Sequence, residues 1–496
     1  MSEPTPGPGM YRQMLQSAAW TVLMRWSMRL VGIVSTVILA RLLTPADFGL
    51  VAMGTLFIGM MANFADLGVS AHLIRKQGAT PAHFDTGWTL GLAQQALVAA
   101  IMYAGAPLWA AYFREPRLEE VVRVMALAAL AAGLENIGMT MARKELQFAL
   151  DFRFNVAKRL AVFFVTVGCA WTLRSYWALV YGYVFGTLAG VVLSYAMHPF
   201  RPQPRLVHAR EFLVFAASII PISIGRFLRD KVDLFVVGRI ASTADVGRYS
   251  MAADLASTFN DEIVAPLGRA LGPNYAKLRG QPDRLAEAFV NVFGAIALVC
   301  IPIGFGLSAI AEPLVVALLG EKWRSTHVLM SWLVFYSTAR TMNRALTGNI
   351  LITIGRERRT LLSTWVELGF ATAAAAYGAW QGGVVGVAKA LTWAGLVTTP
   401  FAIHLLTTAM PVRHLEIIAR LWRPLAGAVL MFLCLRPLVA TLAGHEVHEI
   451  LQLAAAGSAG AAIYAACVVA LWFASGRPPG VESMLAGKLR ARLGRG

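Results

Sequence analysis

The chain has 496 residues, of which 57% are hydrophobic and 14% charged, and its mean hydropathy is +0.60. This composition excludes a string of soluble domains and is typical of a polytopic membrane protein. The formal net charge of +17 would also suit a nucleic-acid-binding protein, but the basic residues lie in alternate loops between apolar runs. We therefore expect no nucleic-acid partner.

Apolar runs long enough to cross a membrane follow one another along the whole chain, with short loops between them. A helix needs about 20 mostly apolar residues to cross the hydrocarbon core. The sequence therefore predicts an all-α integral membrane protein with about 14 transmembrane helices. Their approximate limits, in chain order, are residues 15–40, 46–70, 87–112, 120–140, 158–174, 176–198, 212–238, 244–268, 287–310, 325–348, 360–380, 383–407, 424–442 and 450–474.

One turn motif occurs twice. Residues 41–49 have the sequence RLLTPADFG, and residues 239–247, which lie 198 positions later, have the sequence RIASTADVG. The interval contains an even number of predicted spans, so the two copies enter the membrane in the same direction. The sequence therefore predicts two six-helix bundles that are parallel repeats about an axis along the membrane normal, followed by two extra helices.

The predicted organisation has five parts. They are a disordered cytoplasmic tail (1–14), an N-terminal bundle (15–205), a C-terminal bundle (206–410), a basic linker with two additional transmembrane helices (411–475) and a basic cytoplasmic tail (476–496). With both termini inside, Lys and Arg favour the cytoplasmic side by roughly three to one. The cytoplasmic segment 143–159 is expected to form an amphipathic helix at the membrane surface.

The first predicted helix carries two arginines, Arg25 and Arg29, which share one helix face because they are four residues apart. A rise of about 1.5 Å per residue from residue 15 places Arg25 near the middle of a hydrocarbon core about 30 Å thick. A charge at that depth costs about 2.5 to 3.5 kcal/mol, so it normally faces a water-filled cavity or a partner. We therefore regard both arginines as candidates for a cationic substrate site.

The second copy offers Arg226 and Arg229, just after Pro221 and Gly225. Two interpretations remain open for them. They line a cavity as in the first copy, or they pair within their helix with the carboxylates four residues further on, Asp230 and Asp233. Arg340 and Arg344 lie toward the cytoplasmic end of their span and are expected to reach the membrane interface.

Four further charged residues lie inside predicted spans, namely Asp254, Asp261, Glu367 and Lys389. They are candidates for coupling transport to a proton or cation. Pairing between helices explains them equally well.

Enzyme and cofactor motifs are absent from the sequence. It has no GxxxxGK[ST] motif for ATP binding, and no Ser/His/Asp or paired-carboxylate arrangement can be assembled with any specificity. His445 and His448 lie in one short loop with no further ligand set, which does not suit a metal site. We expect a protein that is not an enzyme and that has no cofactor or metal.

The turn at residues 41–49, followed by NFADLG at 63–68 and LIRK at 73–76, resembles the N-terminal signature of bacterial polysaccharide flippases. These are the Wzx-like exporters of the multidrug/oligosaccharidyl-lipid/polysaccharide superfamily. The specific match covers roughly the first 80 residues, and the span count and the repeat are compatible with it along the whole chain.

The resemblance implies a pair of bundles around a cationic cavity in the bacterial inner membrane, working by alternating access. It implies a cargo of undecaprenyl-pyrophosphate-linked oligosaccharide, carried to the periplasmic leaflet for exopolysaccharide, capsule or O-antigen synthesis. Membrane lipids, a polysaccharide polymerase and a co-polymerase are the partners that it suggests. Arg25, Arg29, Arg226 and Arg229 are the expected pyrophosphate contacts, since a guanidinium offers several donors to anionic oxygens.

Two alternatives keep the same fold. A cation-coupled antiporter for drugs or metabolites would place mainly acidic residues in the cavity, whereas the deepest charges of the first helix are basic. A flippase for a peptidoglycan precursor would share the cationic cavity, but the turn signature favours the polysaccharide branch.

Overall fold

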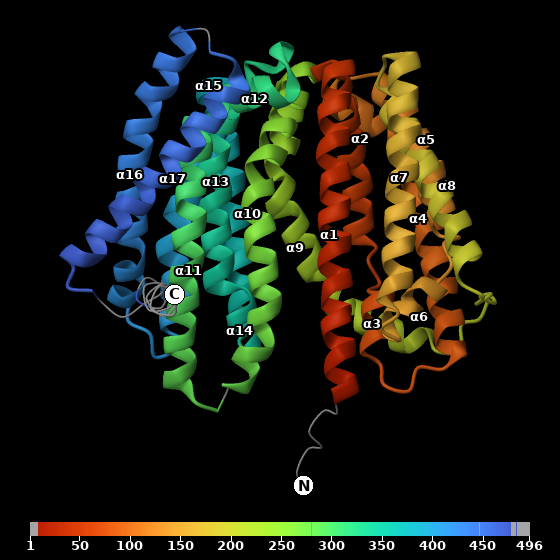
Figure 1. Ribbon diagram of the computed structural model, residues 1–496. Coiled ribbons are helices and arrows are strands. Elements are labelled where there is room, and N and C mark those ends of the chain that lie inside the picture. Colours follow the sequence, from red (N-terminus) through yellow and green to blue (C-terminus); the bar gives the residue numbers. More distant parts are fainter. Residues whose placement is uncertain (1–7, 279, 446, 478–482, 484–496) are drawn as a thin grey trace. The chain divides into compact units, whose positions relative to one another are not determined.

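The protein is described here from a computed structural model, for residues 8–278, 280–445, 447–477 and 483. The side chains of residues 8–19, 21–22, 218–219, 261–274, 276–277 and 349 lie outside the described part. Seventeen α-helices and one 3-10 helix account for all regular secondary structure among these residues, and the expected all-α fold is confirmed (Figure 1).

The first eight helices are α1 (Pro8–Leu42), α2 (Pro45–Phe64), α3 (Val69–Arg75), α4 (Pro81–Phe113), α5 (Arg117–Ala132), α6 (Gly138–Lys144), α7 (Phe148–Leu173) and α8 (Trp177–Met197). The others are α9 (Ala209–Ile240), α10 (Thr243–Lys277), α11 (Pro282–Ala309), α12 (Ala311–Leu319), the 3-10 helix Glu321–Trp323, α13 (Thr326–Thr347), α14 (Asn349–Thr353), α15 (Glu357–Thr407), α16 (His414–Gly444) and α17 (Glu449–Ala474).

The chain forms two compact units. Unit 1 comprises Met1–Leu228 and Ser242–Gly247, and unit 2 comprises Arg229–Ala241 and Arg248–Gly496. Within unit 1 the long helices α1, α2, α4, α5, α7 and α8 run side by side, and the short helices α3 and α6 contact each other near one end (Figure 1). Within unit 2, α11 packs against α13 and α16, and α13 packs against α15.

Nine of the described helices are long and apolar enough to cross a membrane, or ten if the bent pair Ala209–Ala217 and Ile220–Ile240 forms one span. The protein is therefore a multi-pass membrane protein. The predicted number of fourteen spans is not established by this count, because some of the predicted spans correspond to helices that are shorter or less apolar. Helix α5, for example, has only 16 residues.

Helix α15 is counted once although its 51 residues would extend about 75 Å as one straight helix. The backbone is not helical at Gly382 and Gly383, and Gly383 has φ +58°. A side chain on Gly378 would overlap the backbone of Gly386, whereas a continuous helix would separate these residues by about 12 Å. The chain therefore turns back here, as predicted by the break between spans 360–380 and 383–407.

Both copies of the repeated turn are helix N-caps. Asp47 accepts a hydrogen bond from the Thr44 amide (2.8 Å), and the Asp47 amide donates to Thr44 Oγ1 (3.4 Å), which makes a capping box at the start of α2. In the second copy Ser242 Oγ donates to Asp245 Oδ2 (2.6 Å), and the Asp245 amide donates to Ser242 Oγ (3.2 Å). The motif recurs because each copy begins a helix in the same way.

The expected surface helix at residues 143–159 is wrong. Helix α7 begins at Phe148 and continues without a break to Leu173, so most of this segment forms the first turns of a helix that is long and apolar enough to cross a membrane, and not a separate helix. Its polar residues have partners there: Asp151 accepts from Arg143 Nε (2.8 Å), and Lys158 donates to Glu135 (2.9 Å). Because these charges are paired within the protein, they do not require the membrane surface.

Candidate functional site

Arg25 and Arg29 lie on one face of α1, and both are partly exposed. Gly32 continues this face one turn further on. A Cβ on Gly32 would lie 2.8 Å from Nη2 of Arg159 on α7, so the guanidinium of Arg159 lies directly on the backbone of α1. The structure therefore adds a third arginine to the face that carries the two predicted ones.

The sequence did not predict Arg159 as a site residue, because residues 143–159 were assigned to a cytoplasmic segment. Its position depends on the packing of α1 against α7, which are more than 100 residues apart in the chain. The local sequence gives only a weak signal, Gly32, which leaves room for the end of the flexible Arg159 side chain against the backbone of α1.

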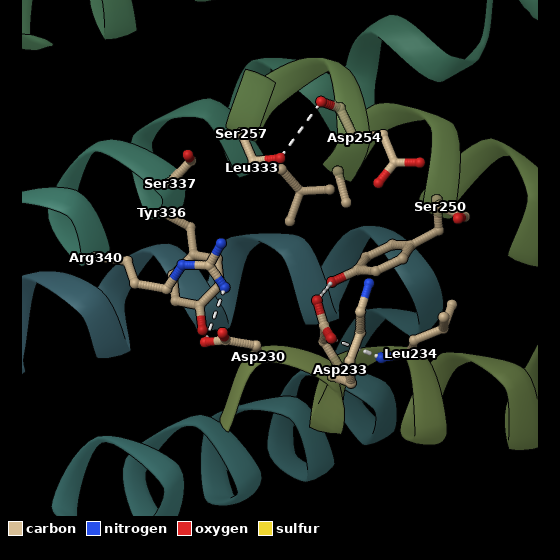
Figure 2. A pocket seen from close by; sticks show the side chains of 13 residues that line it. Asp230, Asp233, Leu234, Ser250, Asp254, Ser257, Leu333, Tyr336, Ser337 and Arg340 are labelled. Carbon is tan, nitrogen blue, oxygen red and sulfur yellow. Dashed lines mark hydrogen bonds and ion pairs between the residues drawn. The ribbon is translucent and has the colours of Figure 1, made fainter. Parts of the chain in front are cut away.

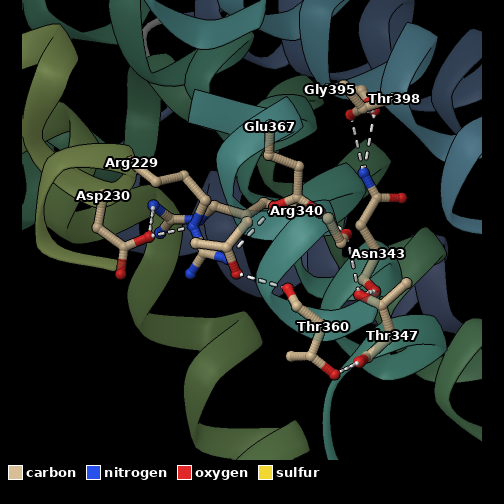
Figure 3. A network of polar contacts seen from close by, with 11 residues as sticks. Arg229, Asp230, Arg340, Asn343, Thr347, Thr360, Glu367, Gly395 and Thr398 are labelled. Carbon is tan, nitrogen blue, oxygen red and sulfur yellow. Dashed lines mark hydrogen bonds and ion pairs between the residues drawn. The ribbon is translucent and has the colours of Figure 1, made fainter. Parts of the chain in front are cut away.

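The other two predicted arginines differ from each other in their surroundings. Arg226 is exposed, whereas the side chain of Arg229 is only 11% exposed. Arg229 Nε donates to Asp230 Oδ1 (3.0 Å), and Arg229 Nη1 donates to Glu367 Oε2 on α15 (3.3 Å) (Figure 3). Glu367 is thus the long-range partner of Arg229, and the partner considered within the helix, Asp233, is wrong.

Asp233 has another role. Its Oδ2 accepts a hydrogen bond from the phenol of Tyr249 on α10 (2.8 Å), and its Oδ1 accepts from the Leu234 amide (2.8 Å) (Figure 2). Tyr249 is 1% exposed. This contact joins α9 to α10 inside unit 2.

Arg340 on α13 completes the ion-pair network. Its Nη1 lies 3.5 Å from Asp230 Oδ1, and its guanidinium carbon lies 5.6 Å from the ring centroid of Tyr336. The expectation that Arg340 reaches the membrane interface is wrong, because a carboxylate and an aromatic face lie closer at hand. Arg344 is exposed, and its expected position at the interface stays a prediction.

The network contains two arginines and two carboxylates, so its formal charges cancel when all four groups are ionised. Glu367 also accepts from Ser363 Oγ (3.1 Å), which in turn lies 3.3 Å from Thr347 Oγ1. Nearby, Asn343 Nδ2 donates to Thr398 Oγ1 (3.0 Å) on the second arm of α15 (Figure 3). These contacts hold α9, α13 and both arms of α15 together.

The remaining candidates for ion coupling lie on α10 and α15, and one of them, Asp254, lines a cavity together with Asp230 and Arg340 of this network. Asp254 is exposed on α10, where its carbonyl oxygen accepts from Thr258 Oγ1 (2.6 Å). Lys389 is exposed on α15, with its ammonium 5.7 Å from the ring centroid of Trp332. The side chain of Asp261 lies outside the described residues.

Unit 2 contains two small cavities beside the network. One, of about 70 Å³, is lined by Asp230, Asp233, Tyr249, Asp254 and Arg340 among others (Figure 2). The other, of about 20 Å³, is lined by Arg229, Arg340, Asn343 and Glu367 among others. Sites for organic ligands usually enclose about 300 Å³ or more, so these two have room for water or a small cation only.

Unit 1 contains a larger cavity of about 400 Å³, which reaches the size of a small-molecule site. Its lining is mixed, and its polar side chains include those of Asp66, Trp88, Gln94, Gln95 and Glu135. None of these residues was singled out from the sequence as a binding residue, because they come from the end of α2, from α4 and from the segment after α5.

The family is decided by comparison with known proteins. The sequence model of a family described as "Polysaccharide biosynthesis protein" matches residues 38–328. This match covers more than half of the chain and includes both repeated turns. The chain belongs to this family. The resemblance inferred from the first turn is therefore confirmed.

Relatives of this family member include two bacterial proteins. The succinoglycan biosynthesis transport protein ExoT of Rhizobium meliloti (strain 1021) is 22% identical over 463 residues, which is 92% of either chain. The teichuronic acid biosynthesis protein TuaB of Bacillus subtilis (strain 168) is 23% identical over 353 residues, 70% of this chain and 73% of TuaB.

A solved structure shows the same fold. The lipid II flippase MurJ, in an inward closed conformation, superposes with a TM-score of 0.71 over 93% of this chain and 100% of MurJ, at 11% sequence identity. At this identity the similarity is evidence for the fold alone.

Proposed function

We propose that this protein is a flippase for lipid-linked oligosaccharides. It moves undecaprenyl-pyrophosphate-linked repeat units from the cytoplasmic to the periplasmic leaflet by alternating access, for exopolysaccharide, capsule or O-antigen biosynthesis. The observation that carries the proposal is that a member of a polysaccharide biosynthesis family has the fold of MurJ, a lipid II flippase. The name of ExoT, a transport protein of succinoglycan biosynthesis, supports it.

The pyrophosphate is the part of such a cargo that arginines recognise. Arg25, Arg29 and Arg159 present guanidinium groups along one face of α1, and each can form two hydrogen bonds to phosphate oxygens. A charge inside a span costs about 2.5 to 3.5 kcal/mol, and an anionic cargo would offset part of this cost. Arg226, which is exposed, is proposed as a further contact.

Arg229 and Glu367 are proposed as a coupling pair. A proton or a cation that binds to Glu367 would neutralise the carboxylate that holds Arg229. The guanidinium of Arg229 would then be free to bind the pyrophosphate. Asp254, Asp261 and Lys389 are retained as further coupling candidates. In this proposal Arg229 contacts the cargo during only part of the cycle.

A cation-coupled antiporter is the second candidate function. The observation that favours it is the 70 Å³ cavity, which is bordered by three carboxylates, Asp230, Asp233 and Asp254. Its size suits a small cation, but the flippase proposal needs such a coupling site as well. Family membership therefore decides in favour of the flippase.

We place the protein in the bacterial inner membrane with both termini in the cytoplasm, since this orientation puts most loop arginines and lysines inside. The division into bundles at 15–205 and 206–410, followed by a basic linker and two additional helices, is part of the proposal, whereas residues 8–14, expected in a disordered tail, belong to α1. A polysaccharide polymerase and a co-polymerase are proposed as partners, because the flipped repeat unit must be polymerised.

The test is complementation of flippase-null strains, with surface polysaccharide and membrane protein level scored together. We expect the wild type to restore polymer, and the double variant Arg25→Ala/Arg29→Ala and the single variant Arg159→Ala to accumulate normally without restoring it. Lys versions should retain part of the activity because they keep the charge.

Arg153→Ala is the matched control, since Arg153 lies on the same helix as Arg159 and is exposed. Normal polymer from the Ala variants of Arg25, Arg29 and Arg159 would overturn the assignment of the site. Failure of the wild type in several polysaccharide systems would favour the antiporter.

A further inference from the structure

Three histidines and a glutamate that are scattered in the sequence meet in unit 1. They come from α3 (His72), the first turn of α4 (His83), the residue before α9 (His208) and the first turn of α9 (Glu211). One potential ligand atom from each of His83, His208 and Glu211 lies within 4.8 Å of the others. We propose that these residues bind a divalent transition-metal ion such as Zn²⁺, with His72 as the fourth ligand.

The donor set suits this class of ion. Imidazole nitrogens with one carboxylate oxygen are the ligands of Zn²⁺, whereas Mg²⁺ and Ca²⁺ require oxygen ligands. His208 Nδ1 lies 3.4 Å from Glu211 Oε1, which is already the separation of two ligands in a tetrahedral zinc site, about 3.3 Å. The other ligand atoms lie within 4.8 Å of one another, and side-chain rotations that move them by about 1 Å would bring them to the spacing of a tetrahedral site.

His72 points to the same carboxylate. Its Nε2 lies 4.0 Å from Glu211 Oε2. This nitrogen is buried and has no hydrogen-bond partner in the described part of the chain. The rings of Phe212 and Phe215, with centroids 4.6 Å and 5.0 Å away, hold the imidazole in place. A metal ion would give this nitrogen the partner that the protein does not supply.

His83 is held by the N-cap of α4. Its Nδ1 accepts a hydrogen bond from the Thr80 amide (3.2 Å) and lies 2.7 Å from Thr80 Oγ1. Binding of a metal through Nε2 requires the ring proton to move to Nδ1, where Thr80 Oγ1 would accept it in place of the amide contact. Its ring is stacked on that of His208, with centroids 3.6 Å apart and planes 7° from parallel. Since imidazole lone pairs lie in the ring plane, binding requires one ring to tilt out of this stack.

A lysine competes with the ion for the carboxylate of Glu211. Lys76 Nζ forms a short ion pair with Glu211 Oε2, so its ammonium now neutralises the carboxylate. Glu211 is 42% exposed and Lys76 26% exposed, which lets the ammonium move into solution. The bound ion would then fix the first turn of α9 to α3 and α4.

The test uses full-length protein with no histidine tag, stripped with a chelator and titrated with ZnCl₂ by calorimetry, and with Co²⁺ by absorption. We expect one ion per chain and the intense d–d bands of tetrahedral Co²⁺. His83→Ala and His208→Ala should each weaken binding at least tenfold. The double variant His445→Ala/His448→Ala, in the loop between α16 and α17 of unit 2, should bind as the wild type does.

Lys76→Met provides a test in the opposite direction, because it removes the competing ammonium and keeps every ligand. It should tighten Zn²⁺ binding several-fold, and it does not depend on how a buried-histidine variant folds. Absence of stoichiometric binding, or equal affinity in the wild type, Lys76→Met and His208→Ala, would overturn the proposal.

Discussion

Gly49 and Gly247, which occupy the same place in the two copies of the repeat, pack backbone against backbone within unit 1. A Cβ on Gly49 would overlap the carbonyl oxygen of Thr243, and a Cβ on Gly247 would overlap that of Pro45. Thr243 and Pro45 are themselves equivalent positions. The contact is therefore reciprocal, and the two turns are related by a local two-fold rotation.

Substituting either glycine by alanine should destabilise the protein. In each case the added Cβ would meet backbone atoms, which cannot rotate away as a side chain can. The loss in free energy of unfolding should therefore exceed the value of about 1 to 3 kcal/mol that is typical of an overpacked core. Thermal unfolding of purified Gly49→Ala and Gly247→Ala should show lower midpoints for both. Gly168→Ala on α7 is the control, since its Cβ would meet nothing within 4 Å. A midpoint equal to that of the control would contradict the reciprocal contact.

The Arg229–Glu367 pair permits a test that separates structure from transport. Arg229→Met alone leaves a buried carboxylate with fewer partners, and loss of one member of a buried pair costs about 3 to 5 kcal/mol. The double variant Arg229→Met/Glu367→Leu removes both charges and should recover most of that stability. If the pair couples transport, the double variant should be stable in the membrane and yet restore no polysaccharide. Full activity of the stable double variant would show that the pair is only structural.

The 400 Å³ cavity of unit 1 can be filled without a collision. Gly91 lines it, and a Cβ there would meet nothing within 4 Å. If the sugars of the cargo enter this cavity, Gly91→Phe should reduce polysaccharide export while protein level and thermal midpoint stay near wild type. Gly168→Phe places the same side chain at another open glycine and should have no effect. Equal export by the two variants would exclude the cavity from the transport path.

Glu115, in the turn between α4 and α5, should make stability depend on pH. Hydrogen bonds from the Arg117 guanidinium (2.8 and 2.9 Å) and from Thr243 Oγ1 (2.6 Å) lower the pKa of this carboxyl in the folded state. A lowered pKa means that the ionised form stabilises the fold above the ordinary carboxyl pKa, and that this stabilisation disappears as the pH falls through the folded-state value.

Thermal midpoints of the wild type and Glu115→Gln should therefore differ most near pH 7 and converge in acid. Glu120→Gln is the control, because Glu120 is an exposed residue on the neighbouring helix. A difference between wild type and Glu115→Gln that does not change with pH would contradict this role of the carboxylate.

The sequence by itself determined those features that depend on neighbouring residues. The capping residues Thr44–Asp47 and Ser242–Asp245 start helices because side chain and backbone lie within one turn of each other. The break at Gly382–Gly383 was predicted for the same reason, since these glycines divide one apolar run into two lengths that each suit a span. The prediction that Arg25 and Arg29 share one helix face likewise follows from counting residues along one helix.

Only the tertiary structure decided which residue each charged side chain contacts. Arg340 joins Asp230, Arg159 lies against Gly32, and Lys76 pairs with Glu211, in each case across more than 100 residues of chain. Periodicity shows which face of a helix carries a charge, but not which helix packs against that face. A buried ion pair is favourable only when the partner is correctly placed. Those placements follow from helix packing, which no local pattern in this sequence records.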